Sequence, residues 1–120
     1  MRATDLERAI FDWIAARNSS LAADLAGASI VKRENTGAGS YTFLGLLREG
    51  VWSEAIPDEL RFENHWEGPT ITSPELELGG GSLLWLSGGR PACLEIYVNG
   101  TEGDPEKVRT FELGDLDGGV

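Results

Sequence analysis

The sequence predicts an α+β fold in which one or two N-terminal helices pack on one face of a five- to six-stranded, mainly antiparallel sheet. Three observations lead to this prediction. Apolar residues recur at helical spacing only before Gly27, they alternate with polar residues after it, and Gly- and Asn-rich turns separate the later runs. Helices followed by strands are typical of α+β proteins. We expect one domain over residues 1–120, with 114–120 as a frayed tail.

A first helix is expected over residues 5–17. Thr4 and Glu7 have the spacing of a capping box, in which the side chain of each residue accepts a hydrogen bond from the backbone N–H of the other. One apolar stripe follows, made of Leu6, Ala9, Ile10, Trp13 and Ile14. Asn18 is a plausible stop, and a shorter second helix is expected over 20–26.

The strand pattern begins with a hairpin. Residues 28–33 and 41–47 are its expected arms, and 35–40 supply turn residues between them. Residues 48–59 are expected to form a connection with a helical turn.

Two further extended segments follow. Over 60–66, Leu60, Phe62 and Trp66 alternate with polar residues, as in a half-buried strand. Residues 70–72 lie between two prolines, and proline cannot donate to a central ladder, so this segment is expected at a sheet edge.

The clearest hairpin has arms at 82–86 and 92–98, joined by a turn at 87–90. Its second arm is expected to face Leu94, Ile96 and Val98 one way, and Cys93, Glu95 and Tyr97 the other. A last strand is expected over 107–113.

The stretch 79–100, GGGSLLWLSGGRPACLEIYVNG, resembles the closing hairpin of small uncharacterised bacterial domains, in which an apolar strand, a Gly turn and a Leu-Glu-Ile-Tyr strand follow an N-terminal helix. The resemblance implies an α+β fold and a bacterial source. It implies no activity.

Charge is unevenly distributed along the chain. The chain has 20 Asp and Glu against 10 Lys and Arg, a net charge of −10. Residues 1–48 carry a net +1 and residues 49–120 a net −11. Nucleic acids and anionic membrane surfaces are bound through Lys and Arg, so neither is expected as a partner. Any charged partner is expected to be basic.

Other features predict a cytoplasmic protein. No run of about 18 apolar residues occurs, so no membrane-spanning helix is expected. The N-terminus lacks the pattern of a secretory signal, and one cysteine cannot form an internal disulfide.

Residue types that carry catalysis are scarce. His65 is the only histidine and Cys93 the only cysteine, and Cys93 has no basic neighbour to lower its pKa. Glu63, His65 and Glu67 would share one face of a strand, which is more often a solvated surface than a metal site. The glycine run 79–81 precedes a strand and fits a turn. We expect no catalytic residue, no metal and no cofactor.

The four tryptophans fall into two groups. Trp13, Trp66 and Trp85 lie in periodic patterns and are expected in the core. Trp52 lies within the acidic stretch 49–77, where it fits either packing over the sheet edge or anchoring a partner.

These observations support two hypotheses. The first is a non-enzymatic interaction module that presents an acidic face to a basic protein, for example a toxin-neutralising immunity protein. Its partner-binding candidates are Trp52, Glu54, Asp58, Glu59, Glu63 and Glu67. The alternative is a small-molecule-binding protein or enzyme whose pocket, between helix and sheet, uses His65, Glu95 and Tyr97. A buried Glu95 would need a partner such as Arg48 or Arg61. The scarcity of His, Cys and Lys favours the first hypothesis.

Overall fold

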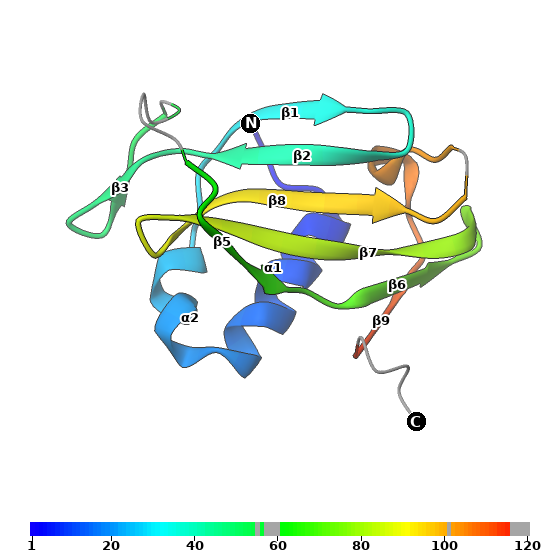
Figure 1. Cartoon of the computed structure of the whole chain (residues 1–120), viewed down its shortest axis with the longest axis horizontal. Coiled ribbons are helices and arrows are strands. Elements are labelled where there is room, and N and C mark those ends of the chain that lie inside the picture. Colours follow the sequence, from blue (N-terminus) through cyan, green and yellow to red (C-terminus); the bar gives the residue numbers. More distant parts are fainter. Residues whose placement is uncertain (55, 57–60, 101, 116–120) are drawn as a thin grey trace.

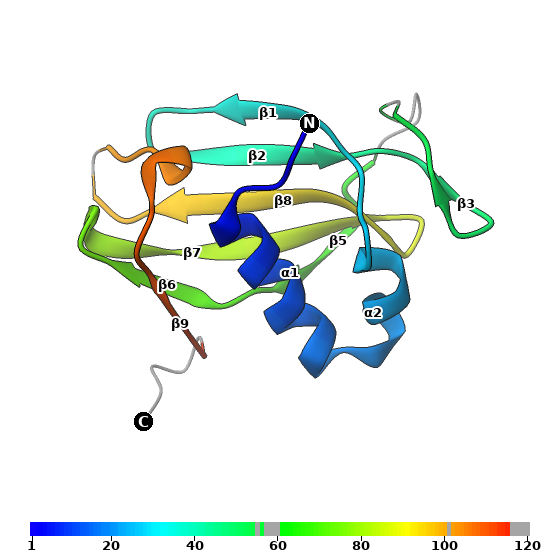
Figure 2. The ribbon, with the colours of Figure 1, turned by 180° about the vertical axis from the view of Figure 1, so that it is seen from behind.

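Helices precede strands along the chain, and both helices cover the same face of the sheet. The computed structural model describes the chain except residues 55, 57–60, 101 and 116–120. Two helices come first, followed in the described part by nine strands and one 3-10 helix. Figure 1 looks onto the sheet with the helices behind it, and Figure 2 shows them in front. The α+β prediction is confirmed.

The two helices match their predicted ranges to within one residue. They are α1, Asp5–Arg17, and α2, Ser19–Leu25. The strands are β1 Ile30–Asn35, β2 Gly39–Leu44, β3 Leu47–Arg48, β4 Val51–Trp52, β5 Asn64–Glu67, β6 Thr70–Ser73, β7 Leu76–Ser87, β8 Arg90–Val98 and β9 Glu112–Gly114. The 3-10 helix η1 spans Pro105–Lys107.

Seven strands form the main sheet, and every pairing in it is antiparallel. Their order is β1-β2-β8-β7-β6-β9, and β5 also pairs with β7. The long strand β7 therefore has β8 along one side and, along the other, β6 and β5 in turn. Strand β1 is outermost at one edge. Strands β3 and β4 form a separate two-stranded hairpin.

The predicted capping box starts α1. The Thr4 hydroxyl accepts a hydrogen bond from the Glu7 N–H at 3.1 Å, and a Glu7 carboxylate oxygen accepts one from the Thr4 N–H at 2.8 Å. Asn18 both ends α1, through its N–H to the Ile14 carbonyl, and caps α2, through its side chain to the Ser20 N–H. One residue thus sets the sharp change of direction between the helices.

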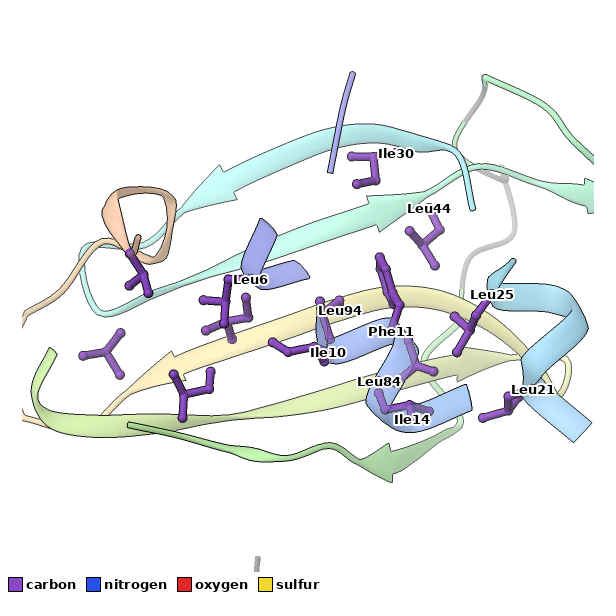
Figure 3. Close-up of a cluster of buried hydrophobic side chains, with 14 of the residues drawn as sticks. Leu6, Ile10, Phe11, Ile14, Leu21, Leu25, Ile30, Leu44, Leu84 and Leu94 are labelled. Atoms are coloured by element: carbon purple, nitrogen blue, oxygen red, sulfur yellow. The ribbon is translucent and has the colours of Figure 1, made fainter. Parts of the chain in front are cut away.

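The core lies between the helices and the sheet, as Figure 3 shows. The helices contribute buried apolar side chains from Leu6, Ile10, Phe11, Ile14, Leu21 and Leu25, which face Ile30, Leu44, Leu84 and Leu94 of the sheet. Trp13 of α1 meets Trp66 of β5 edge to face, with ring centroids 6.2 Å apart, and both pack against this core. Their predicted core positions are confirmed.

A buried carboxylate joins α1 to the sheet. Glu7 is 1% exposed, and the Arg33 Nε–H of β1 donates to it at 2.9 Å. A second Arg33 N–H and the Thr42 hydroxyl of β2 also donate to Glu7. Burial raises the pKa of Glu7, but the hydrogen bonds from Arg33, Thr42 and the Thr4 N–H outweigh burial, so its pKa lies below the usual 4.5.

The predictions for the first half of the sheet need corrections. The first hairpin is confirmed, but its arms are β1 and β2, so the predicted segments 28–33 and 41–47 were displaced from the observed strands. Leu47 belongs to β3, beyond the hairpin. In the connection 48–59, strand β4 follows a tight turn with positive φ at Glu49 and Gly50, and residues 55 and 57–59, over which the expected helical turn could extend, lie outside the described residues.

The later strands also differ from the predictions. Residues 70–72 are not at an edge, because β9 pairs with β6 on its outer side. Over 107–113, only Glu112 and Leu113 belong to a strand, β9, and Lys107 instead ends η1, which Asp104 caps through the Glu106 N–H. Gly114, predicted to be frayed, ends β9. The run 79–81 lies inside β7, and Leu60 and 116–120 lie outside the described residues.

We predict that Arg33→Met lowers the free energy of unfolding by about 3–5 kcal/mol, because it leaves the Glu7 carboxylate buried without its cation. Denaturant unfolding at neutral pH measures the change. Arg8→Met removes an exposed arginine of α1 and is the matched control, expected to change stability by no more than about 0.5 kcal/mol. Equal losses in the two variants would contradict a role for the buried pair.

The lowered pKa of Glu7 also predicts a pH dependence. The charged carboxylate contributes stability above the usual pKa of 4.5, and this contribution is lost as the pH falls through the lower folded value. Wild type should therefore exceed Glu7→Gln in stability by a constant amount near neutral pH, and by progressively less below about pH 4.5. Denaturant titrations of both proteins across this range test it. A difference that stays the same at every pH would refute it.

Candidate functional site

The face of the main sheet opposite the helices carries the candidate site. Along β8, Leu94 and Ile96 enter the core, so Cys93, Glu95 and Tyr97 between and beyond them point to the other face, as the alternation predicted. Figure 1 views this face, and both helices lie behind it. We call it the open face. Strand pairing places on it Lys32, Glu34, Tyr41, Phe43, His65, Glu67, Leu83, Trp85, Cys93, Glu95 and Tyr97.

One row on the open face alternates acidic and apolar side chains across five strands. From β1 through β2, β8 and β7 to β5, the paired residues are Glu34, Tyr41, Glu95, Leu83 and Glu67. Glu95 is half-buried between its two apolar neighbours, and the glutamates at the ends are exposed. We call these five residues the acid row.

The neighbouring row is mainly aromatic. Its paired residues, in the same strand order, are Lys32, Phe43, Cys93, Trp85 and His65. The two aromatic rings are half-buried and flank the fully buried cysteine, while the two basic side chains at the ends are exposed. The middle of the open face is therefore mainly aromatic and apolar, with Glu95 as its one acidic side chain in the described part, and its margins are polar and exposed.

Tyr97 lies on the other side of the acid row. Its cross-strand neighbours are Gly39 and Gly81, neither of which has a side chain. A Cβ atom at Gly81 would collide with the Tyr97 ring, so the ring lies directly against this glycine. A large aromatic surface is thereby held flat on the sheet.

Trp85 connects the two rows. Its indole N–H donates to a Glu95 carboxylate oxygen at 2.9 Å, which fixes the carboxylate. Phe62 stacks on Trp85 with ring centroids 5.8 Å apart, and His65 meets the indole edge to face at 4.9 Å. Because Leu84 occupies the core-facing position, the predicted core location of Trp85 was wrong. The strand predicted over 60–66 also placed Phe62 and Trp66 on one side. Strand β5 begins only at Asn64, and Phe62 stacks on Trp85 of the open face while Trp66 packs against the core.

The charge of Glu95 acts on its neighbours. It is the main cause that raises the pKa of Tyr41, its cross-strand partner. Burial raises the pKa of Cys93 to about 12, and Glu95 adds to this effect. Cys93 is therefore a neutral thiol at physiological pH and a poor nucleophile.

The carboxylates of the open face have little compensation. Lys32 pairs with Glu34, and both side chains are about half exposed, so this ion pair is weak. The other ion pairs in the described part are Arg17–Asp115, Arg33–Glu7 and Arg90–Asp24. Within the described residues, neither Glu67 nor Glu95 forms an ion pair, and neither does any carboxylate of the stretch 49–77.

The alternative site residues do not line a pocket between helix and sheet. His65, Glu95 and Tyr97 lie on the open face, which the helices do not touch. The partner of Glu95 is Trp85, where Arg48 or Arg61 was expected. Alternation along β8 correctly separated Glu95 and Tyr97 from the core, but it did not indicate which face the helices cover.

The predicted partner-binding residues are dispersed. Trp52 is half-buried and packs against the core, in agreement with its packing interpretation, and its role as a partner anchor stays a prediction. Glu54 is exposed after β4, and Glu63 is exposed just before β5. Of the set, Glu67 alone joins the acid row. Asp58 and Glu59 lie outside the described residues.

Sequence reasoning missed Glu34, Tyr41 and Leu83 as members of one site. One signal was available: the run from Leu83 to Leu86 is apolar at every position, although an antiparallel strand with one wet face normally alternates. Such a run indicates that the second face also carries apolar side chains. The row itself depends on strand register, which the sequence does not state.

The remaining observations concern other kinds of site. Among the described residues, no helix could span a membrane, and no His, Cys, Asp and Glu side chains group as metal ligands. A hollow of about 390 Å³ lies at the β6–β7 turn, and one of about 420 Å³ lies beside the start of α1. Neither is lined by the acid row.

A comparison of the chain with protein-family models, curated proteins and solved structures finds no match. The resemblance of 79–100 to small bacterial domains stays a prediction. The open face is thus the feature from which a function can be inferred.

Cys93 offers a direct test of how the open face is packed. The native thiol should react with a disulfide reagent at least about 1,000-fold more slowly than in the unfolded chain, since it is fully buried and reaction needs opening. Trp85→Ala should speed the reaction beyond its effect on global stability, because Trp85 is the cross-strand neighbour of Cys93. Trp52→Ala, on a different part of the core, is the control. Equal acceleration in both variants would contradict local cover by Trp85.

Proposed function

We propose that this chain is a cytoplasmic, non-enzymatic interaction module that binds a basic polypeptide through its open face. The observation that carries the proposal is the acid row, in which the half-buried Glu95 is fixed by Trp85 between apolar neighbours without an ion pair in the described part. Neutralisation of a bound toxin is one function of this type.

The composition of the open face supports binding. Half-buried rings from Tyr41, Phe43, Trp85 and Tyr97 lie beside Leu83 on one face. Aromatic side chains are enriched where proteins meet partners, since they contribute a large contact area and lose little conformational entropy. A face that carries this many apolar side chains indicates an interaction surface.

Charge supports a basic partner. A second copy of this chain would bring another acidic surface with the same net charge of −10, so self-association through this face is disfavoured. A basic polypeptide gains ion pairs with Glu34, Glu67 and Glu95 and is steered by the field of the whole chain. Rim charges act mainly on the association rate, whereas the half-buried Glu95 is expected to affect dissociation.

The chemistry of the same face supports binding over catalysis. Cys93 is buried, with its pKa raised to about 12. His65 is exposed and contacts Trp85, which lies between it and Cys93 in the row. Nucleophilic catalysis needs a nucleophile within hydrogen-bonding reach of its base, and no such pair of Cys93 and His65 is found among the described residues.

The proposal predicts that open-face carboxylates decide partner capture. We expect the immobilised wild-type chain to retain a basic protein from its own cell at low salt and release it at high salt. The triple variant Glu34→Gln/Glu67→Gln/Glu95→Gln should retain at least about tenfold less of this basic protein than wild type, because charge-assisted contacts are removed. Quantitative mass spectrometry of the retained proteins measures it.

The matched control is Asp12→Asn/Glu106→Gln/Glu112→Gln, which removes the same charge from α1, η1 and β9. It should capture the partner almost as well as wild type. Equal loss in both triple variants would mean that net charge alone drives capture and would refute a site on the open face. Thermal unfolding of all three proteins checks that each is folded.

A further inference from the structure

We propose that the acid row receives a polyproline II segment with a basic residue at every third position, lying across the strands. This inference rests on the proposed function and names the chemistry of the partner at the same face. It depends on the spacing of Glu34, Glu95 and Glu67, which strand pairing places in one row.

The carboxylates of the acid row recur at every second strand. Glu34 is on β1, Glu95 on β8 and Glu67 on β5, with β2 and β7 between them. Neighbouring strands lie about 4.7–4.9 Å apart, so consecutive carboxylate positions are about 9.5 Å apart and the row spans about 19 Å. A ligand that engages all three needs cations at this repeat, on one side of its backbone.

A polyproline II helix has this repeat. It has three residues per turn and rises about 3.1 Å per residue, so every third side chain lies on the same side about 9.3 Å further on. An extended β-strand repeats on one side about every 6.7 Å. An α-helix places neighbours on one face about 5–6 Å apart. Of the three, polyproline II alone matches the row at consecutive repeats.

The residues between the carboxylates fit the same ligand. Tyr41 and Leu83 separate the glutamates and offer apolar contact for the intervening prolines. Tyr97 extends this surface on β8. Within the described part, neither tyrosine hydroxyl makes a hydrogen bond to another residue, so both can donate to the ligand. The carbonyls of polyproline II have no internal partners, and aromatic-lined surfaces commonly recognise this helix.

Glu95 is the central contact. Trp85 donates to one carboxylate oxygen and so fixes its orientation, while the second oxygen has no partner among the described residues. A guanidinium placed there can bind this oxygen and lie against the neighbouring Tyr41 ring. The terminal glutamates are exposed and contribute less, and Glu34 must also release Lys32.

Three blocked nonapeptides of identical composition, three arginines and six prolines, test the inference. They place arginine at every third position, at every second position, or contiguously, so charge is constant and only spacing varies. Calorimetric titration at low salt gives the affinity of each. We expect the first peptide to bind at least about tenfold more tightly than the other two, since they cannot place all three charges on the row.

Variants locate the contact. Glu95→Gln keeps an acceptor for Trp85 but removes the charge, and it should weaken the first peptide by about tenfold while leaving thermal unfolding unchanged. Asp12→Asn removes one exposed charge from α1 and should leave the affinity unchanged.

The outcomes separate this inference from the proposed function. Equal affinities for the three peptides, all weakened by Glu95→Gln, would overturn the polyproline II inference and leave a basic partner at the open face. Absence of binding, or binding insensitive to Glu95→Gln, would overturn the inference and also count against the open face as a site for basic ligands.

Discussion

The buried Glu7 carboxylate is the interaction on which the arrangement of this protein depends. It caps α1 through Thr4, and it receives hydrogen bonds from Arg33 of β1 and Thr42 of β2. A charge at this depth is tolerated only with its partners in place, so moving α1 away from β1 and β2 would leave the Glu7 carboxylate buried without them. These hydrogen bonds join Glu7 to Arg33, 26 positions further along the chain, and to Thr42, 35 positions further along. Together with the apolar core, the buried carboxylate holds the helices on one face of the sheet and leaves the other face open.

The division of the sheet into two faces explains why its central strands are apolar throughout. Leu84 and Leu94 pack under the helices, while Trp85 and Leu83 on alternate positions form the open face. Core residues are selected for packing, whereas side chains on an uncovered face are free to serve recognition. The central hairpin of β7 and β8 therefore contributes side chains both to the core and to the open face, and the parity of a position decides which of the two its side chain joins.

Local signals in the sequence predicted what depends on near neighbours. The capping box at Thr4, the stop at Asn18 and the alternation of Leu94 with Glu95 needed only a few adjacent residues, and all were found. Features set by distant partners were missed. Arg33 as the partner of Glu7 and the position of β9 beside β6 both depend on long-range pairing. Trp85 was assigned to the wrong face because the run 83–86 is apolar at every position, so no alternation shows which side chains face the core. The acid row could not be predicted either, because it depends on the long-range register of five strands at once.

The outermost strand β1 carries a further consequence. An uncovered strand edge presents unpaired backbone groups, to which the strands of other molecules can add and so build fibrils. The exposed Lys32 and Glu34 put side chains of opposite sign on this edge, next to Arg33, which is held by Glu7. An approaching copy would have to strip water from these charges before its backbone could pair. The arginine that anchors the helix thus belongs to a strand whose charges discourage amyloid-like stacking of the native chain.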